Sequence, residues 1–168
     1  MTAHSAGHYD FGNKQHAYEA LAGALDALLS GERDLIANAA NTAALIYSAL
    51  PDINWCGFYF LHDTELVLGP FQGQPACVRI ALGRGVCGTA AAQRITQIVA
   101  DVNEFPGHIA CDAASRSELV VPLLRTAATG HLQLLGVLDI DSPLVARFDN
   151  ADARGVERLA QLLVDSLG

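Results

Sequence analysis

The sequence predicts an α+β domain in which one mostly antiparallel sheet of about six strands is flanked by helices. Two apolar patterns with helical spacing come first, and a third closes the chain. Between them lies a run of short segments with the composition and alternation typical of strands. Because helices precede and follow the strands instead of alternating with them, we expect a single sheet with helices packed against it.

The long helices are expected at 14–30, at 33–49 and after Asp149, which is the expected N-cap of the last one. Gly31 and Pro51 provide the stop signals of the first two. Apolar residues recur at three- and four-residue steps, which in the first helix are Tyr18, Leu21, Leu25 and Leu28.

A short Ala-rich helix near 89–93 is expected after a glycine turn at 83–88, and the stretch 101–116 is irregular. Residues 1–12 are polar and carry no periodic pattern. We therefore expect a loose leader over 1–12 and one domain over 13–168. The strands are expected at 54–61, 65–68, 76–82, 96–100, 117–124 and 131–140, the last two as a hairpin.

Charge and hydropathy exclude several classes of function. The net charge is −8 and no local cluster of Lys or Arg offsets it, which disfavours nucleic acids and anionic membranes as partners. The apolar runs end well short of a membrane-spanning length, and the N-terminal residues do not resemble a secretion signal. We therefore expect a cytoplasmic protein with a small zwitterionic or cationic ligand.

The chain contains four cysteines, Cys56, Cys77, Cys87 and Cys111. In a reducing cytosol they are better interpreted as core thiols, metal ligands or redox catalysts than as structural disulfides. None of them forms a C-x2-C pair, and no His stands at a zinc-finger offset. We therefore expect no metal site and no cofactor.

The first expected strand has two different faces. Alternation places Trp55 and Tyr59 on one face and Cys56, Phe58 and Phe60 on the other. The second face is wholly apolar, so Cys56 is expected to be a small buried hydrophobe. Trp55 and Tyr59 either wall a pocket for an apolar or onium-like group or pack against the leading helices. The residues alone leave both interpretations open.

Three acidic residues are expected to lie close together. Asp139 and Asp141 are separated by one residue on a strand and so project from the same face, with Glu118 in reach on the adjacent strand. Neighbouring carboxylates raise one another's pKa, so that one can donate a proton while another binds an ammonium group. Alternatively, these acids face water at strand ends or bind a metal.

Two further segments contain residues of interest. The loop 103–116 is long for so small a domain, and long loops often carry function; it holds Cys111, three residues after His108. The pattern Gly83-x-Gly85-x-x-Gly88 lacks the βαβ context of a dinucleotide loop. Its glycines are instead expected to let the backbone approach a ligand or to place Cys87 closely.

Together these residues resemble the GAF-domain free methionine-(R)-sulfoxide reductases. The resemblance covers roughly residues 14–165 and implies a GAF-like fold, reduction of free L-methionine-(R)-sulfoxide to methionine, thioredoxin as reductant and a homodimer. The matching stretches are Asn54-Trp-x-Gly-Phe-Tyr59, Ala76-Cys77, Gly83-Arg-Gly-Val-Cys-Gly-Thr89, Asp101-Val102, Phe105-Pro-Gly-His-Ile-Ala-Cys-Asp112, Ser117-Glu-Leu-Val-Val-Pro122 and Gly136-Val-Leu-Asp-Ile-Asp-Ser142.

The resemblance also implies roles for individual residues. Cys111 would be the attacking thiolate and become a sulfenic acid, Cys77 the main resolving thiol, and Cys87 a second or relay thiol. The remaining residues would bind the substrate: Glu118 and Asp141 at the sulfoxide oxygen, Asp139 at the α-ammonium, and Trp55 and Tyr59 around the methyl end.

Two alternatives come from other classes of protein. The first is a non-catalytic GAF module that senses a small ligand or redox state; such sensors are usually fused to an output domain, which this sequence does not contain. The second is a cysteine hydrolase, which needs a His held against the nucleophile. His108 is near Cys111 in the sequence, but no third orienting residue can be assigned.

Overall fold

The computed structural model describes residues 9–107 and 114–168 of the chain. Six strands form one sheet in the order β3-β2-β1-β6-β5-β4, and every neighbouring pair is antiparallel. The elements are η1 (Phe11–Asn13), α1 (Lys14–Leu29), α2 (Leu35–Ala49), β1 (Trp55–His62), β2 (Glu65–Gly73), β3 (Arg79–Ala81), α3 (Gly85–Gln93), β4 (Gln97–Val99), η2 (Val102–Glu104), β5 (Ser117–Thr126), β6 (Leu132–Ser142) and α4 (Asn150–Ser166).

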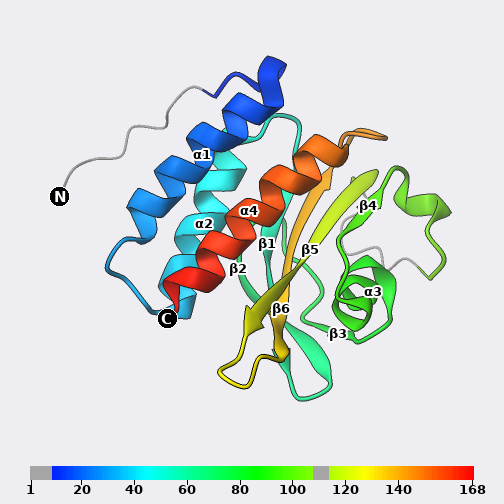
Figure 1. The fold of residues 1–168 in the computed structure, drawn as a ribbon. Helices are drawn as coiled ribbons and strands as arrows, with labels where there is room; N and C mark the ends of the chain where they lie inside the picture. The colour runs from blue at the N-terminus through cyan, green and yellow to red at the C-terminus, as the bar shows by residue number, and fades with distance from the viewer. Residues whose placement is uncertain (1–8, 108–113) are drawn as a thin grey trace.

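The helices divide between the two faces of the sheet. Helices α1, α2 and α4 cover one face, and α3 lies on the opposite side (Figure 1). This arrangement confirms the predicted α+β class, with a six-stranded antiparallel sheet. None of the helices in the described part of the chain is long and apolar enough to cross a membrane.

Side-chain caps fix where the long helices begin. The Asp34 side chain accepts a hydrogen bond from Ala37 N at 2.8 Å, so α2 begins at Leu35, two residues later than expected. Asp149 caps α4, as predicted, in a capping box with Asp152.

Strand β2 runs five residues beyond its expected end at residue 68. The continuation includes Pro70, and proline cannot donate to a ladder. In the structure Leu68 pairs with Tyr59 and Phe71 with Gly57, so Gly69 and Pro70 occupy the register shift between those pairs. The irregularity accommodates the proline and lets the strand continue. Strand β3, by contrast, is shorter than expected because only residues 79–81 pair with β2.

Residues 9–12, expected to belong to a loose leader, instead contact the domain. Tyr9 and Phe11 are partly buried against the helix-side core, and the Phe11 ring meets Tyr18 edge-on at a centroid distance of 5.3 Å. Asp10 accepts a hydrogen bond from Gly12 N and so caps the η1 turn. Two aromatic side chains in an otherwise polar segment explain the attachment.

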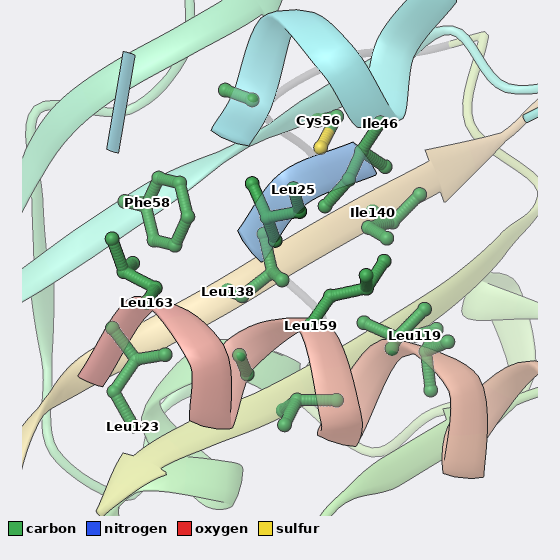
Figure 2. Packing of buried hydrophobic residues seen from close by; sticks show 14 of the residues in the cluster. Leu25, Ile46, Cys56, Phe58, Leu119, Leu123, Leu138, Ile140, Leu159 and Leu163 are labelled. Carbon is green, nitrogen blue, oxygen red and sulfur yellow. The ribbon is translucent and has the colours of Figure 1, made fainter. Parts of the chain in front are cut away.

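The main core lies between the sheet and helices α1, α2 and α4. Figure 2 shows Leu25, Ile46 and Leu159 meeting apolar side chains of β1, β5 and β6. Cys56 is fully buried in this core, and burial raises the pKa of its thiol. The prediction that Cys56 is a small buried hydrophobe is therefore confirmed.

A buried carboxylate joins α1 to α4. Asp152 is fully buried and accepts hydrogen bonds from Tyr18 Oη at 2.9 Å and from Lys14 Nζ at 2.6 Å. The Arg147 guanidinium lies 3.4 Å from the same carboxylate. Because a buried charge is tolerated only when it is paired and hydrogen-bonded, these contacts fix the helix layer against which the sheet is held.

Candidate active site

The candidate site lies on the face of the sheet opposite the main core, at the ends of β1, β6 and β5. The register places Trp55, Asp141 and Glu118 side by side across three strands. Asp139 is two residues before Asp141 and pairs with Gly57 of β1. Side chains two residues apart share a face, so the predicted juxtaposition of the three acids is confirmed.

A pocket opens above these residues and is covered by the first turn of α3. Its volume is about 40 Å³, which is room for two or three waters. A ligand of amino-acid size would also occupy the open mouth. The pocket is lined by Trp55, Tyr59, Pro75, Ala76, Ile80, Arg84, Gly85, Val86, Cys87, Ser115, Glu118, Asp139 and Asp141.

The aromatic wall is fixed by hydrogen bonds and stacking. Trp55 Nε1 donates to the Gln74 carbonyl and Tyr59 Oη donates to the Cys77 carbonyl, both at 3.0 Å. The Trp55 ring stacks on Phe71 at 5.4 Å and lies 6.0 Å from the Tyr59 ring. Both aromatic residues therefore form the pocket wall, and the alternative that they pack against the leading helices is wrong.

Gly57 makes room for this wall. A Cβ at that position would lie 2.6 Å from Trp55 Cη2 and 2.3 Å from Phe71 Cβ. Any side chain would therefore push the indole off the strand and into the pocket.

Helix α3 brings a thiol to the acids. Gly83 and Gly85 have φ values of +79° and +60°, a backbone conformation that favours glycine. A Cβ on Gly88 would lie 2.4 Å from the Ala81 carbonyl oxygen. The helix begins at Gly85, four residues earlier than expected, because the glycine turn itself becomes its first turn and carries Cys87 into the pocket.

The topology around this segment agrees with the prediction that its glycine pattern is not a dinucleotide-binding loop. The glycine turn connects β3 to α3 within a wholly antiparallel sheet, whereas a dinucleotide fingerprint requires a parallel βαβ unit.

Cys87, Glu118 and Asp139 form a buried cluster. Their donor atoms all lie within 4.8 Å of one another, and Cys87 Sγ is 3.9 Å from Glu118 Oε1. The three residues are only 4–6% exposed. Asp139 Oδ1 is buried and has no hydrogen-bond partner among the residues that the structure describes.

Burial and like charge shift the pKa values of this cluster. The pKa of Glu118 lies well above its ordinary value because of burial and then because of the charges of Asp139 and Asp141. Burial also raises the pKa of Asp139, and hydrogen bonds from Cys87 and Glu118 partly offset that rise. The raised pKa favours the protonated form of Glu118, which can donate a proton.

The Cys87 thiol is an unfavourable nucleophile in this environment. Burial, followed by the charges of Asp139 and Glu118, raises its pKa well above the ordinary value. Since the thiolate is the reactive form, Cys87 stays protonated at neutral pH.

The other cysteines have different states. Cys77 is disulfide-bonded in this structure, whereas Cys56 and Cys87 are free thiols. Cys77 lies between β2 and β3, next to the pocket-lining Ala76. Cys111 and His108, both singled out in the sequence, lie outside the described residues.

Arg84 and Ser115 line the pocket but were not singled out from the sequence. Arg84 is the N-cap residue of α3, and Ser115 Oγ accepts a hydrogen bond from Asn54 Nδ2 at 3.2 Å. Neither stands in a periodic pattern that indicates a site. For Arg84, the only sequence feature that indicated a role in the pocket was its position within the glycine-rich segment.

An antiparallel sheet with a helix layer on one face and a pocket on the other is an architecture found in GAF domains. Residues 37–167 match the GAF domain family. The chain belongs to the GAF domain family. Its relatives show to which group within that family it belongs.

The free methionine-R-sulfoxide reductase of Escherichia coli is 52% identical to this chain over 151 residues, which cover 90% of this chain and 88% of that protein. Two of the solved structures that match with high TM-scores carry the name of this activity. One is the fRMsr of Staphylococcus aureus in complex with substrate, which is 46% identical with a TM-score of 0.83 and coverage of 90% of this chain and 95% of that one. The other is the free methionine-R-sulfoxide reductase of Neisseria meningitidis in complex with its substrate, which is 42% identical with a TM-score of 0.86 and coverage of 95% and 93%. Within the GAF domain family, the chain therefore belongs to the free methionine-R-sulfoxide reductases.

Proposed function

We propose that this protein is an oxidoreductase that reduces free L-methionine-(R)-sulfoxide to methionine through a cysteine sulfenic acid and a disulfide. The observation that carries the proposal is the pocket in which Glu118, Asp139 and Asp141 lie beneath Trp55 and Tyr59. A sulfoxide needs a proton donor at its oxygen, an amino acid needs an anion at its ammonium, and this pocket offers both.

The substrate is oriented by groups of complementary chemistry. Asp139 carries a buried oxygen without a partner among the described residues, so the substrate's α-ammonium would donate to it, assisted by neighbouring acids. Glu118 and Asp141 would donate to or protonate the sulfoxide oxygen. Trp55 and Tyr59 would enclose the methyl group. Arg84, at the mouth, is suited to the substrate carboxylate because it adds a positive charge at the N-terminus of α3.

In the chemical step the sulfoxide oxygen moves from the substrate sulfur to Cys111 Sγ. A proton from the acid cluster goes to the sulfoxide oxygen as the Cys111 thiolate attacks the substrate sulfur and forms a sulfur–sulfur bond. The resulting hydroxyl then moves to Cys111 Sγ, while the sulfur–oxygen bond of the substrate and the sulfur–sulfur bond both break. Methionine leaves and Cys111 becomes a sulfenic acid, so the thiol is oxidised by two electrons and the sulfoxide is reduced by two.

Cys77 then closes the cycle as the resolving thiol. Its thiol attacks the sulfenic acid of Cys111, forming a disulfide and releasing water. The disulfide-bonded state of Cys77 in this structure is consistent with that role. A dithiol such as thioredoxin would reopen the disulfide and become oxidised itself. Cys87, whose raised pKa disfavours attack, is retained as a second or relay thiol.

The acids also explain a preference for the free amino acid. A peptide-bound residue has no ammonium group, so it would leave the buried Oδ1 of Asp139 without a hydrogen-bond donor, and buried polar atoms without partners are costly. The R preference and the homodimer remain predictions from the family resemblance, and the single domain over 13–168 remains a prediction from chain length and sequence pattern. A cytoplasmic location suits an enzyme that must be reduced after every turnover.

Cysteine variants test the assignment of the thiols. Cys111→Ser is expected to abolish turnover, while Cys77→Ser performs about one turnover per chain and then stalls with a sulfenic acid at Cys111. Dimedone labelling followed by mass spectrometry detects that acid. Cys56→Ala is the matched control, since Cys56 lies in the other core, and it should keep steady-state turnover.

Two outcomes would contradict the assignment. Substantial turnover by folded Cys111→Ser would remove Cys111 as the nucleophile. Tight binding of methionine sulfoxide without turnover by the reduced wild type would instead favour the non-catalytic sensor.

A further inference from the structure

The buried cluster of Cys87, Glu118 and Asp139 has the composition of a metal-binding site. The three donors come from three separate elements, α3, β5 and β6, so no short sequence motif indicates a metal site. The absence of a C-x2-C pair led us to expect no metal. The fold nevertheless brings one thiol and two carboxylates within 4.8 Å of one another.

The spacing of these donors fits a tetrahedral ion with little rearrangement. With zinc–sulfur and zinc–oxygen bonds of about 2.3 and 2.1 Å, a tetrahedron places sulfur and oxygen ligands about 3.6 Å apart. Cys87 Sγ and Glu118 Oε1 are 3.9 Å apart. A shift of a few tenths of an ångström, within the reach of side-chain rotation, brings them to that distance.

Asp139 indicates a missing cationic partner, which the substrate's ammonium group or a metal ion would supply. Its Oδ1 is buried and has no hydrogen-bond partner among the described residues, although Asp139 lines the pocket. An unpartnered carboxylate oxygen is costly to bury, and a cation bound there would remove the cost. The pocket volume of about 40 Å³ has room for an ion and the one or two waters that complete its coordination.

We propose that Cys87, Glu118 and Asp139 bind one divalent ion of the zinc class in this pocket, and that the ion excludes the substrate. Binding of the ion would release the protons of Cys87 and Glu118 to solvent. The resulting thiolate and two carboxylates suit zinc or cobalt, whereas magnesium and calcium require oxygen ligands alone. The exclusion of substrate rests on the proposed function, because it assigns the same acids to the amino acid. The binding of the ion does not rest on it.

The disulfide form of the protein allows a direct test. In that form Cys77 is bonded, and of the two free thiols described, Cys56 is buried in the opposite core. Titration of oxidised protein with Co²⁺, without reductant, is expected to give a thiolate-to-cobalt charge-transfer band that saturates at one ion per chain. Zn²⁺ should displace the cobalt and abolish the band.

Variants of the three donors identify the site. Cys87→Ser is expected to abolish the charge-transfer band, and Asp139→Asn or Glu118→Gln to weaken Co²⁺ binding at least tenfold. Cys56→Ala is the matched control and should keep both the band and the affinity. Circular dichroism verifies that each variant is folded, and the two carboxylate variants test the site independently of the thiol.

The outcomes separate this proposal from the proposed function. A band that persists in Cys87→Ser, unchanged affinity in both carboxylate variants, or no saturable binding at micromolar Co²⁺ would overturn the metal site. Methionine sulfoxide should lower the apparent Co²⁺ affinity. If Co²⁺ binds as described but methionine sulfoxide does not compete, the exclusion of substrate is wrong and the metal site stands.

Discussion

Replacing the buried Asp139 carboxyl by an amide should stabilise the fold at neutral pH while it weakens substrate binding. Asp139 is 6% exposed, and burial raises its pKa from 3.8 to about 6. A group whose pKa is raised on folding stabilises the protein below its unfolded pKa, and that stability is lost as the pH rises through the folded pKa. One pKa unit corresponds to about 1.4 kcal/mol, so the two-unit rise costs about 3 kcal/mol.

Asn at position 139 cannot titrate and should escape this cost. The free energy of unfolding of Asp139→Asn minus that of wild type should therefore increase by about 2–3 kcal/mol between about pH 4 and pH 7. Urea denaturation of both proteins in the disulfide form measures this difference. Asp26→Asn, on the exposed side of α1, controls for the loss of one acidic residue.

The change with pH is the decisive quantity, because a lost hydrogen bond or altered packing shifts stability equally at both pH values. A stability difference that is the same at both would refute the conclusion that folding buries Asp139 at an electrostatic cost. The same variant should also bind methionine more weakly, because the buried Asp139 carboxylate is proposed to bind the ammonium group of the amino acid.

Three further predictions concern other parts of the molecule. Gly88→Ala should lower turnover and destabilise the fold by about 1–3 kcal/mol, because its Cβ meets the Ala81 carbonyl oxygen at 2.4 Å; wild-type kinetics and melting temperature would contradict this. Asp152→Ala should cost about 3–5 kcal/mol by removing the carboxylate that pairs with the largely buried Arg147 and accepts from Tyr18, as measured by urea denaturation, and a loss below about 1 kcal/mol would contradict it. The single-turnover rate should fall at alkaline pH, because loss of the proton held by Glu118 through its raised pKa removes the donor; stopped-flow measurements that show only a rise to a plateau would exclude Glu118 as the acid.

Much of the fold could be predicted because local signals agree with the tertiary structure. The apolar stripe of α1 and the Asp149 cap of α4 depend only on neighbouring residues, and both were found. The length of β2 could not be predicted in this way. Pro70 is tolerated within the strand because a register shift against β1 removes the need for a backbone N–H donor at this position. That shift is a property of the pair of strands.

In the candidate site too, features set by local sequence pattern could be predicted and features set by tertiary packing could not. The two faces of β1 and the shared face of Asp139 and Asp141 follow from alternation alone, and both predictions are confirmed. The approach of Cys87 to Glu118 depends on how α3 packs across β5, which alternation does not determine. Arg84 and Ser115 reach the pocket from turns, where no period marks the side that faces inward.

The most direct test of the central claim is NADPH consumption in a thioredoxin-coupled assay with one substrate at a time: free L-methionine-(R)-sulfoxide, the free S epimer and a peptide-bound sulfoxide. We predict turnover with the free R epimer alone, since only a free amino acid offers an ammonium group to Asp139. Turnover of the peptide-bound sulfoxide at a comparable rate would contradict the role of the buried acids, and no turnover of any of the three by folded, fully reduced protein would contradict the reductase itself.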